Sequence, residues 1–100
     1  MPLGRGELQG YDFNRIVVEF TMLNRDKVVQ CAISTAAMDD LEGKRDVKPH
    51  QRVDQFMRLR EAIEEQASQK FFEERGRIDR PLILRSNDFS IVASLKSNRS

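Results

Sequence analysis

The stretch RIVVEFTMLNRDKVVQCAI, residues 15–33, decides the fold because apolar and polar side chains alternate in it twice. Its first half places four apolar residues on one strand face: Ile16, Val18, Phe20 and Met22. Its second half does the same with Val29, Cys31 and Ile33. A period of two with β-branched residues is typical of half-buried strands. The polar segment Leu23–Asp26 lies between the two halves, so we expect an antiparallel hairpin.

A short helix is predicted directly after this hairpin. Ser34 stands where an N-cap belongs, because its hydroxyl can accept a hydrogen bond from an amide of the first turn. The helix would cover Thr35–Glu42 and end at Gly43, which can adopt the left-handed conformation of a C-cap. The charged segment Lys44–Lys48 is expected to be a loop.

A long helix is predicted from His50 to Arg75, a range without glycine or proline, and Pro49 suits its first turn. One apolar stripe runs along it: Val53, Phe56, Met57, Ile63, Ala67 and Phe71. Asp54–Arg58 and Arg60–Glu64 are opposite charges four residues apart. A straight helix of this span would be about 39 Å long. A domain of this size is about 33 Å across, so we expect the helix to bend or to overhang the sheet.

The two ends of the chain look different from its centre. Residues 1–10 contain three glycines and one proline, and we expect a flexible lead-in there. Pro81 opens a third strand at Leu82–Arg85, and Ser86–Asp88 is turn-like. The pattern from Phe89 to Lys96 alternates again and is compatible with a fourth strand or an ordered tail.

These elements predict an α+β fold in the order β-β-α-α-β. Its two layers would be a small antiparallel sheet and a short and a long helix packed on it. We expect one domain over residues 11–89 and a C-terminal extension over residues 90–100.

Composition limits the classes of protein that remain. The 100 residues are 33% charged and 39% hydrophobic with a net charge of +1, which fits a single small soluble domain. No window is apolar enough to span a membrane, and we expect no secretory signal peptide. One cysteine excludes an intramolecular disulfide, and one cysteine with one histidine are too few for a zinc site. We therefore expect a cytoplasmic protein without a cofactor or a bound metal.

Few residues could carry catalysis. Cys31 could be a reactive thiol near a helix N-terminus, but it shares a strand face with Val29 and Ile33, as a core residue would. His50 has no partner visible in the sequence. The carboxylates are expected to form solvated helix faces: Asp39, Asp40, Glu42, Asp46, Glu64, Glu65, Glu73 and Glu74. This inventory favours a protein that is not an enzyme.

Short motifs along the chain resemble a known family. They are Val29–Ser34, Leu41–Gly43, Phe56–Arg58 with Ile63, Glu64 and Ala67, and Leu82–Phe89. In this order they look like the small bacterial family catalogued as domain of unknown function 1488. The resemblance covers Asp12–Phe89, and it implies helices packed on a small antiparallel sheet. It implies no activity, cofactor or catalytic residue, and it makes the residues after Phe89 an extension.

Positive charge gathers near the C-terminus. Residues 77–100 hold five basic and two acidic residues, a net charge of +3, whereas the remaining 76 residues have a net charge of −2. Four arginines could form a patch that contacts phosphates or an acidic protein: Arg75, Arg77, Arg80 and Arg85. A nucleic-acid-associated protein that uses this segment is therefore the alternative hypothesis.

The favoured hypothesis is a non-enzymatic interaction or regulatory domain, whose partner would be another protein or a second copy of the chain. Phe71 and Phe72 are consecutive, so a helix cannot bury both on one narrow stripe. We expect one of them in the core and the other exposed at an interface. Self-association could use the helix end near Phe72 or an exposed strand edge.

Overall fold

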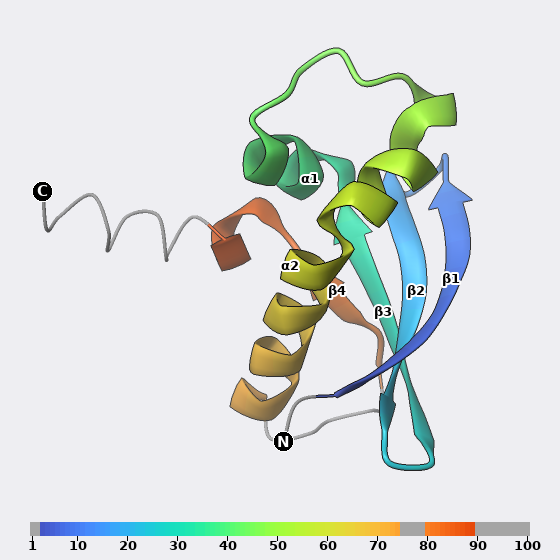
Figure 1. Ribbon diagram of the computed structural model, residues 1–100, viewed down its shortest axis with the longest axis vertical. Coiled ribbons are helices and arrows are strands. Elements are labelled where there is room, and N and C mark those ends of the chain that lie inside the picture. Colours follow the sequence, from blue (N-terminus) through green and yellow to red (C-terminus); the bar gives the residue numbers. More distant parts are fainter. Residues whose placement is uncertain (1–2, 75–79, 90–100) are drawn as a thin grey trace, which may run out of the picture.

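The computed structural model of the chain describes residues 3–74 and 80–89, and within them the strands and helices follow one another as shown in Figure 1. The order is β1 (Gly4–Asp12), β2 (Val17–Asn24), β3 (Lys27–Ser34), α1 (Thr35–Glu42), the 3-10 turn η1 (Pro49–Gln51), α2 (Arg52–Glu73) and β4 (Leu82–Leu84). A helical turn at residues 86–89 follows β4.

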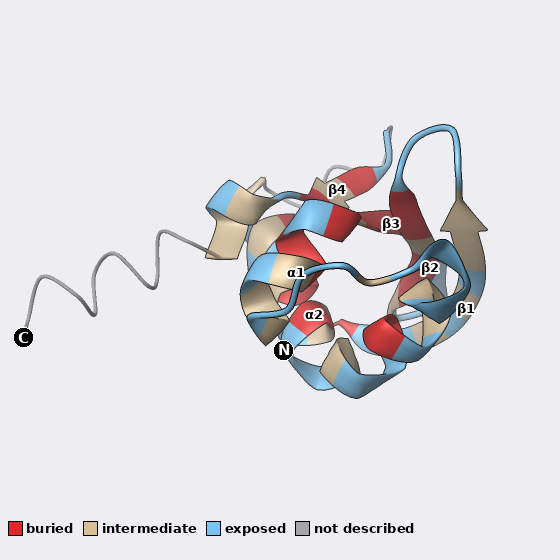
Figure 2. Cartoon of the chain, turned by 90° about the horizontal axis from the view of Figure 1, so that it is seen from above, coloured by how far each residue is buried: buried red, intermediate tan, exposed pale blue. Residues whose placement is uncertain are grey.

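The strands form one sheet in the order β1-β2-β3-β4, and it curves around the two helices, which lie on its concave face (Figures 1 and 2). The α+β prediction with a short and a long helix is confirmed. The sheet is mixed, however, because β4 pairs with β3 in parallel. The chain leaves β3 and returns through α1 and α2, and such a helical crossover brings the next strand back in the same direction.

The prediction of a flexible lead-in over residues 1–10 is wrong from Gly4 onward. Strand β1 begins at this residue and pairs with β2. Gly6 and Gly10 lie where the pairing of β1 with β2 is irregular. The register slips between Arg5 and Leu8 and again between Leu8 and Gly10. At the first bulge Gly6 lies against Thr21, and the Glu7 N–H donates to Thr21 Oγ1 at 2.8 Å. The Thr21 hydroxyl thus satisfies a donor that the bulge withdraws from the ladder.

Replacing Gly6 with alanine is expected to lower the free energy of unfolding by about 1–3 kcal/mol, because a Cβ there would overlap Thr21. The matched control is Gly4→Ala, since a Cβ at Gly4 would lie 3.7 Å from Leu23, an ordinary contact. Urea denaturation of both variants measures the difference. Equal stabilities would contradict this explanation of the bulge.

The hairpin is confirmed, with the core residues Val18, Phe20, Met22, Val29, Cys31 and Ile33 all buried. Ile16 was expected on the same face but lies before β2, where its side chain is 54% exposed. The helix stripe is correct for Phe56, Ile63, Ala67 and Phe71. It is wrong for Met57, which points to solvent, and it omits Gln55, which is fully buried.

Both predicted caps of α1 are confirmed. The Ser34 hydroxyl accepts a hydrogen bond from the Ala37 N–H at 3.1 Å, and Gly43 adopts a φ of 71° at the C-cap. Helix α2 has 22 residues and is shorter than expected at both ends. Its length is about 33 Å, close to the longest extent of the molecule, 37 Å.

Strand β4 ends at Leu84, one residue earlier than predicted, and Asp88 closes the following turn by donating its N–H to the Arg85 carbonyl at 3.0 Å. The question of a fourth predicted strand from Ser90 onward lies outside the described residues.

Candidate functional site

Cys31 lies in the core on β3 and is 3% exposed. Burial raises the pKa of its thiol to about 12, so the reactive thiolate is scarce at neutral pH. Its Sγ lies 3.6 Å from the Val29 carbonyl oxygen. This environment supports a packing role for Cys31 and gives the reactive-thiol hypothesis no support.

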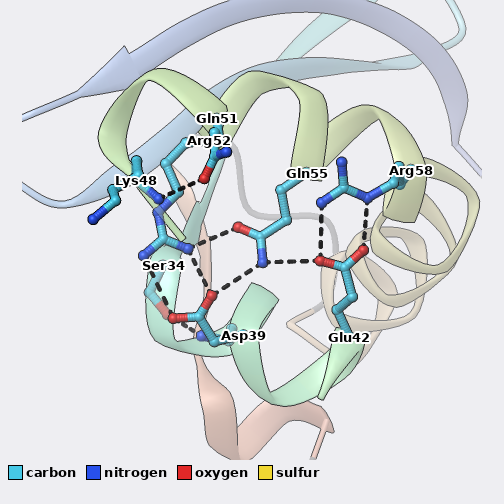
Figure 3. A network of polar contacts seen from close by, with 9 residues as sticks. Ser34, Asp39, Glu42, Lys48, Gln51, Arg52, Gln55 and Arg58 are labelled. Carbon is cyan, nitrogen blue, oxygen red and sulfur yellow. Dashed lines mark hydrogen bonds and ion pairs between the residues drawn. The ribbon is translucent and has the colours of Figure 1, made fainter. Parts of the chain in front are cut away.

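Two of the carboxylates expected on a solvated face instead join α1 to α2 (Figure 3). The Asp39 carboxylate accepts a hydrogen bond from the Arg52 guanidinium at 2.6 Å. The Glu42 carboxylate accepts two from the Arg58 guanidinium, at 2.7 and 3.1 Å. Gln55 lies between the two pairs. Its amide donates to Asp39 at 3.0 Å and to Glu42 at 3.3 Å, and its carbonyl oxygen accepts from Arg52 at 2.7 Å.

This polar network holds the two helices together. The hydrogen bond from Arg58 is the main reason why the pKa of Glu42 lies below its ordinary value. Arg58 was predicted to pair with Asp54, but its guanidinium hydrogen-bonds to Glu42 on α1 instead. All carboxylates in the network already have cationic or amide partners, which favours a structural role over acid–base chemistry.

A second ion-pair group joins β1 to α2. Glu64 accepts hydrogen bonds from Arg5 at 2.9 Å and from Arg60 at 3.0 Å, and the second of these pairs was predicted. Burial raises the pKa of Glu64, but the hydrogen bonds from the two arginines outweigh it and leave this pKa below its ordinary value. Glu64 is thus held ionised as an anchor for the N-terminal strand.

The backbones of both edge strands are contacted by cations from α2. Lys70 donates from Nζ to the Ile83 carbonyl on β4 at 2.7 Å, and Arg60 donates to the Gly6 carbonyl on β1 at 3.3 Å. Lys70 also pairs with Asp88 at 3.1 Å. Cations and bulges at sheet edges oppose pairing with a further strand. These contacts weigh against self-association through a strand edge.

The predicted interaction residues are only partly brought together. Phe71 is 1% exposed, whereas Phe72 is 48% exposed and touches Phe71 edge to face, with ring centroids 5.2 Å apart. This is the division between core and surface that the sequence indicated. Arg80 and Arg85 are both exposed, but they lie beyond opposite ends of the strand β4, which itself is about 10 Å long. Arg75 and Arg77 lie outside the described residues.

The segment joining β1 to β2, residues 13–16, exposes two large apolar side chains, and we call it the 13–16 loop. Phe13 is 69% exposed and Ile16 54%, both higher than Phe72. The Phe13 ring rests on Tyr11, with centroids 4.7 Å apart. Phe13 was not predicted from the sequence as a site residue, although an aromatic residue between Asp12 and Asn14, which favour turns, was an available signal.

The backbone of the 13–16 loop is held firmly. The Asp12 carboxylate accepts from the Asn14 N–H at 2.9 Å and from the Arg15 N–H at 3.2 Å. The Asp12 carbonyl accepts from the Ile16 N–H at 2.8 Å, and the Ile16 carbonyl accepts from the Thr35 N–H at 3.1 Å. The loop is therefore fastened at both ends, once to β1 and once to the start of α1.

Ile16 adopts a φ of 57°, which is strained for a β-branched residue. Such strain costs about 1–3 kcal/mol and concentrates at functional positions. A rigid loop that displays an aromatic and an aliphatic side chain has the properties of a binding anchor, because little conformational freedom is lost on contact. The 13–16 loop is our candidate site.

The surface hollows are a poorer candidate. One of about 470 Å³ lies beside the loop after α1, and another of about 530 Å³ lies along α2. Both are open to solvent, and charged side chains such as Asp40, Arg45 and Glu61 line them. Ligand pockets are mostly apolar with a few polar groups, so neither hollow resembles a binding site for a small molecule.

Nowhere in residues 3–74 and 80–89 do three histidine, cysteine or acidic side chains gather as metal ligands would. Within the same ranges, each helix is too short or too polar to cross a lipid bilayer.

Comparison with known proteins places the chain in a family. The family model described as a protein of unknown function, DUF1488, matches residues 6–84. The chain belongs to the DUF1488 family. No curated protein matches it.

The DUF1488 match begins inside β1 and ends at the last residue of β4, so it includes the 13–16 loop. A crystal structure of a DUF1488 protein of unknown function from Shewanella loihica PV-4 has a similar fold, with a TM-score of 0.63 and 20% sequence identity. The similarity covers 79% of this chain and 90% of the other. At this identity the likeness concerns the fold alone.

Proposed function

We propose that this DUF1488 protein is a non-enzymatic interaction domain with a regulatory role in the bacterial cytoplasm. The observation that carries the proposal is the 13–16 loop, which displays Phe13 and Ile16 on a firmly bonded and strained backbone. Aromatic anchors of this kind supply much of the binding energy at protein interfaces. The partner is a protein, either another chain or a second copy.

Several side chains that could take part in catalysis are engaged in structural contacts instead. Cys31 is buried, and the ion pairs with Arg52, Arg58 and Arg60 hold the carboxylates of Asp39, Glu42 and Glu64. His50 is exposed in η1. A free Cys31 thiol in an intact core also suits a reducing compartment. These features support a binding role in the cytoplasm.

Site-specific photo-crosslinking in cells tests this proposal. A photoreactive phenylalanine analogue at position 13 is expected to give a discrete protein adduct, whereas the same analogue at the exposed strand position Gln30 gives none. The captured protein is identified by mass spectrometry, purified and titrated against the wild type and Phe13→Ser. We expect Phe13→Ser to weaken binding at least about tenfold. Equal crosslinking at both positions, or unchanged affinity, contradicts the proposal.

Nucleic-acid binding through the basic C-terminal segment is expected to fail. Arg80 and Arg85 are separated by β4, and the domain carries a net charge near zero, so few phosphates can be neutralised together. Fluorescence anisotropy of labelled duplex DNA and single-stranded RNA at low salt measures this. A salt-dependent rise that is lost in the double variant Arg80→Glu and Arg85→Glu would establish the alternative function instead.

A further inference from the structure

Residues 3–6, which we call the N-terminal strap, are bonded to α2 as well as to β2. The Leu3 N–H donates to the buried Ser68 hydroxyl at 2.9 Å, and the Leu3 side chain belongs to the core. The Arg5 guanidinium donates to both oxygens of the Glu64 carboxylate, at 2.9 Å each. Two successive odd positions of the strap are therefore held by the helix.

The residues of α2 that hold the strap lie four apart on one face of the helix: Arg60, Glu64 and Ser68. Arg60 completes the set by donating to the Gly6 carbonyl at 3.3 Å. Among the residues that the structure describes, no hydrogen bond joins α2 to the rest of β1, residues 7–12. The helix thus fastens only the first part of this strand.

Irregular pairing separates the strap from the second part of β1. The register with β2 slips after Arg5 and again before Gly10, and only residues 10–12 then continue in an unbroken register. Between the slips, the Glu7 N–H donates to the Thr21 side chain. A bulge interrupts the ladder locally, and segments that open together are contiguous cooperative units. The ladder therefore couples the strap only weakly to residues 10–12.

We propose that the N-terminal strap opens and closes separately from the rest of β1, and that Glu64 is the side chain that holds it closed. Opening exposes one core side chain of the strap, Leu3, because Gly4 and Gly6 have no side chains and Arg5 is already 53% exposed. The movement is therefore much less costly than global unfolding.

The open strap uncovers the edge of β2 at Met22 and Leu23, which pair with Arg5 and Gly4 in the closed form. A free strand edge can take up an extended segment of another protein. The strap thus acts as an internal cover of this edge. It is separate from the 13–16 loop, so the proposal does not depend on the function proposed above.

Thiol labelling of the folded full chain tests the proposal in the variant Leu3→Cys. The native Cys31, which is 3% exposed in the core, reports global unfolding in the same molecule. Each labelling rate is divided by the rate of the same thiol in denaturant. We expect the thiol at position 3 to react at least about tenfold faster than Cys31, because the strap opens without global unfolding.

A second substitution identifies the side chain that holds the strap. Added to Leu3→Cys, Glu64→Ala is expected to raise the labelling rate at position 3 at least about fivefold and to leave Cys31 unchanged, since it removes the charged acceptor of Arg5. Ser68→Ala, which removes the acceptor of the Leu3 N–H, is expected to act in the same direction. Glu65→Ala is the matched control, because Glu65 is the next residue on α2 and is exposed.

Two outcomes would overturn the proposal. Equal normalised rates at position 3 and at Cys31 would mean that the strap opens only when the whole domain unfolds. An equal rise at both thiols in Glu64→Ala and Ser68→Ala would mean that these side chains stabilise the whole domain and do not hold the strap in particular.

Discussion

Phe71→Ala is expected to lower the free energy of unfolding by about 3–5 kcal/mol, the largest effect of any substitution considered in this domain. The Phe71 ring is 1% exposed and belongs to the core between α2 and the concave face of the sheet. Alanine removes most of this buried surface and leaves a cavity that a close-packed core cannot fill. Urea denaturation monitored by circular dichroism gives the value.

The matched control is the next residue along α2. Phe72→Ala removes the same atoms from a side chain that is half exposed, so we expect a loss below about 1 kcal/mol. Equal losses at the two positions would show that the last turn of α2 is oriented differently. The pair thus measures the orientation of the helix end without reference to any function.

Asp39→Ala is expected to lower the free energy of unfolding by about 1–3 kcal/mol. The substitution removes the partner of the largely buried Arg52 and one acceptor of the buried Gln55 amide. An unpaired cation in this position retains its desolvation cost, whereas an exposed ion pair contributes little.

Asp40→Ala is the control, because Asp40 is the next residue on α1 and is exposed. We expect its effect to stay within about 0.5 kcal/mol. The difference between the two variants should persist in 0.5 M salt, since the Arg52 contact is only partly exposed to screening. A difference that vanishes in salt would mean that the Asp39 contact acts as a surface pair.

Local signals predicted the centre of the fold well. The alternation in residues 15–33 identified the hairpin, and Ser34 and Gly43 marked both ends of α1 because caps are read from adjacent residues. The long apolar stripe identified α2 for the same reason. Each of these features depends on neighbours within a few positions of the sequence.

Features that depend on distant residues were missed. Strand β1 was taken for a flexible segment because glycines usually mark loops. Here Gly6 and Gly10 lie at register slips: Thr21 leaves no room for a Cβ at Gly6, and Gly10 has a φ of 127°. The direction of β4 depends on the path through both helices. The contacts of Asp39 and Glu42 join residues more than ten positions apart, so no helix spacing rule could reveal them.

One residue of the candidate site, Ile16, was also predicted wrongly. Ile16 continues the apolar alternation of β2, and the sequence therefore predicts it in the core. Its exposure follows from a positive φ that hydrogen bonds to Asp12 and Thr35 hold in place. By contrast, the division of Phe71 and Phe72 between core and surface was predictable, because it follows from helix geometry alone.

The most direct test of a binding role for the 13–16 loop is photo-crosslinking in cells from position 13, compared with the exposed strand position Gln30. We expect a discrete protein adduct from position 13 and none from position 30. Equal crosslinking at the two positions would contradict a binding role for this loop.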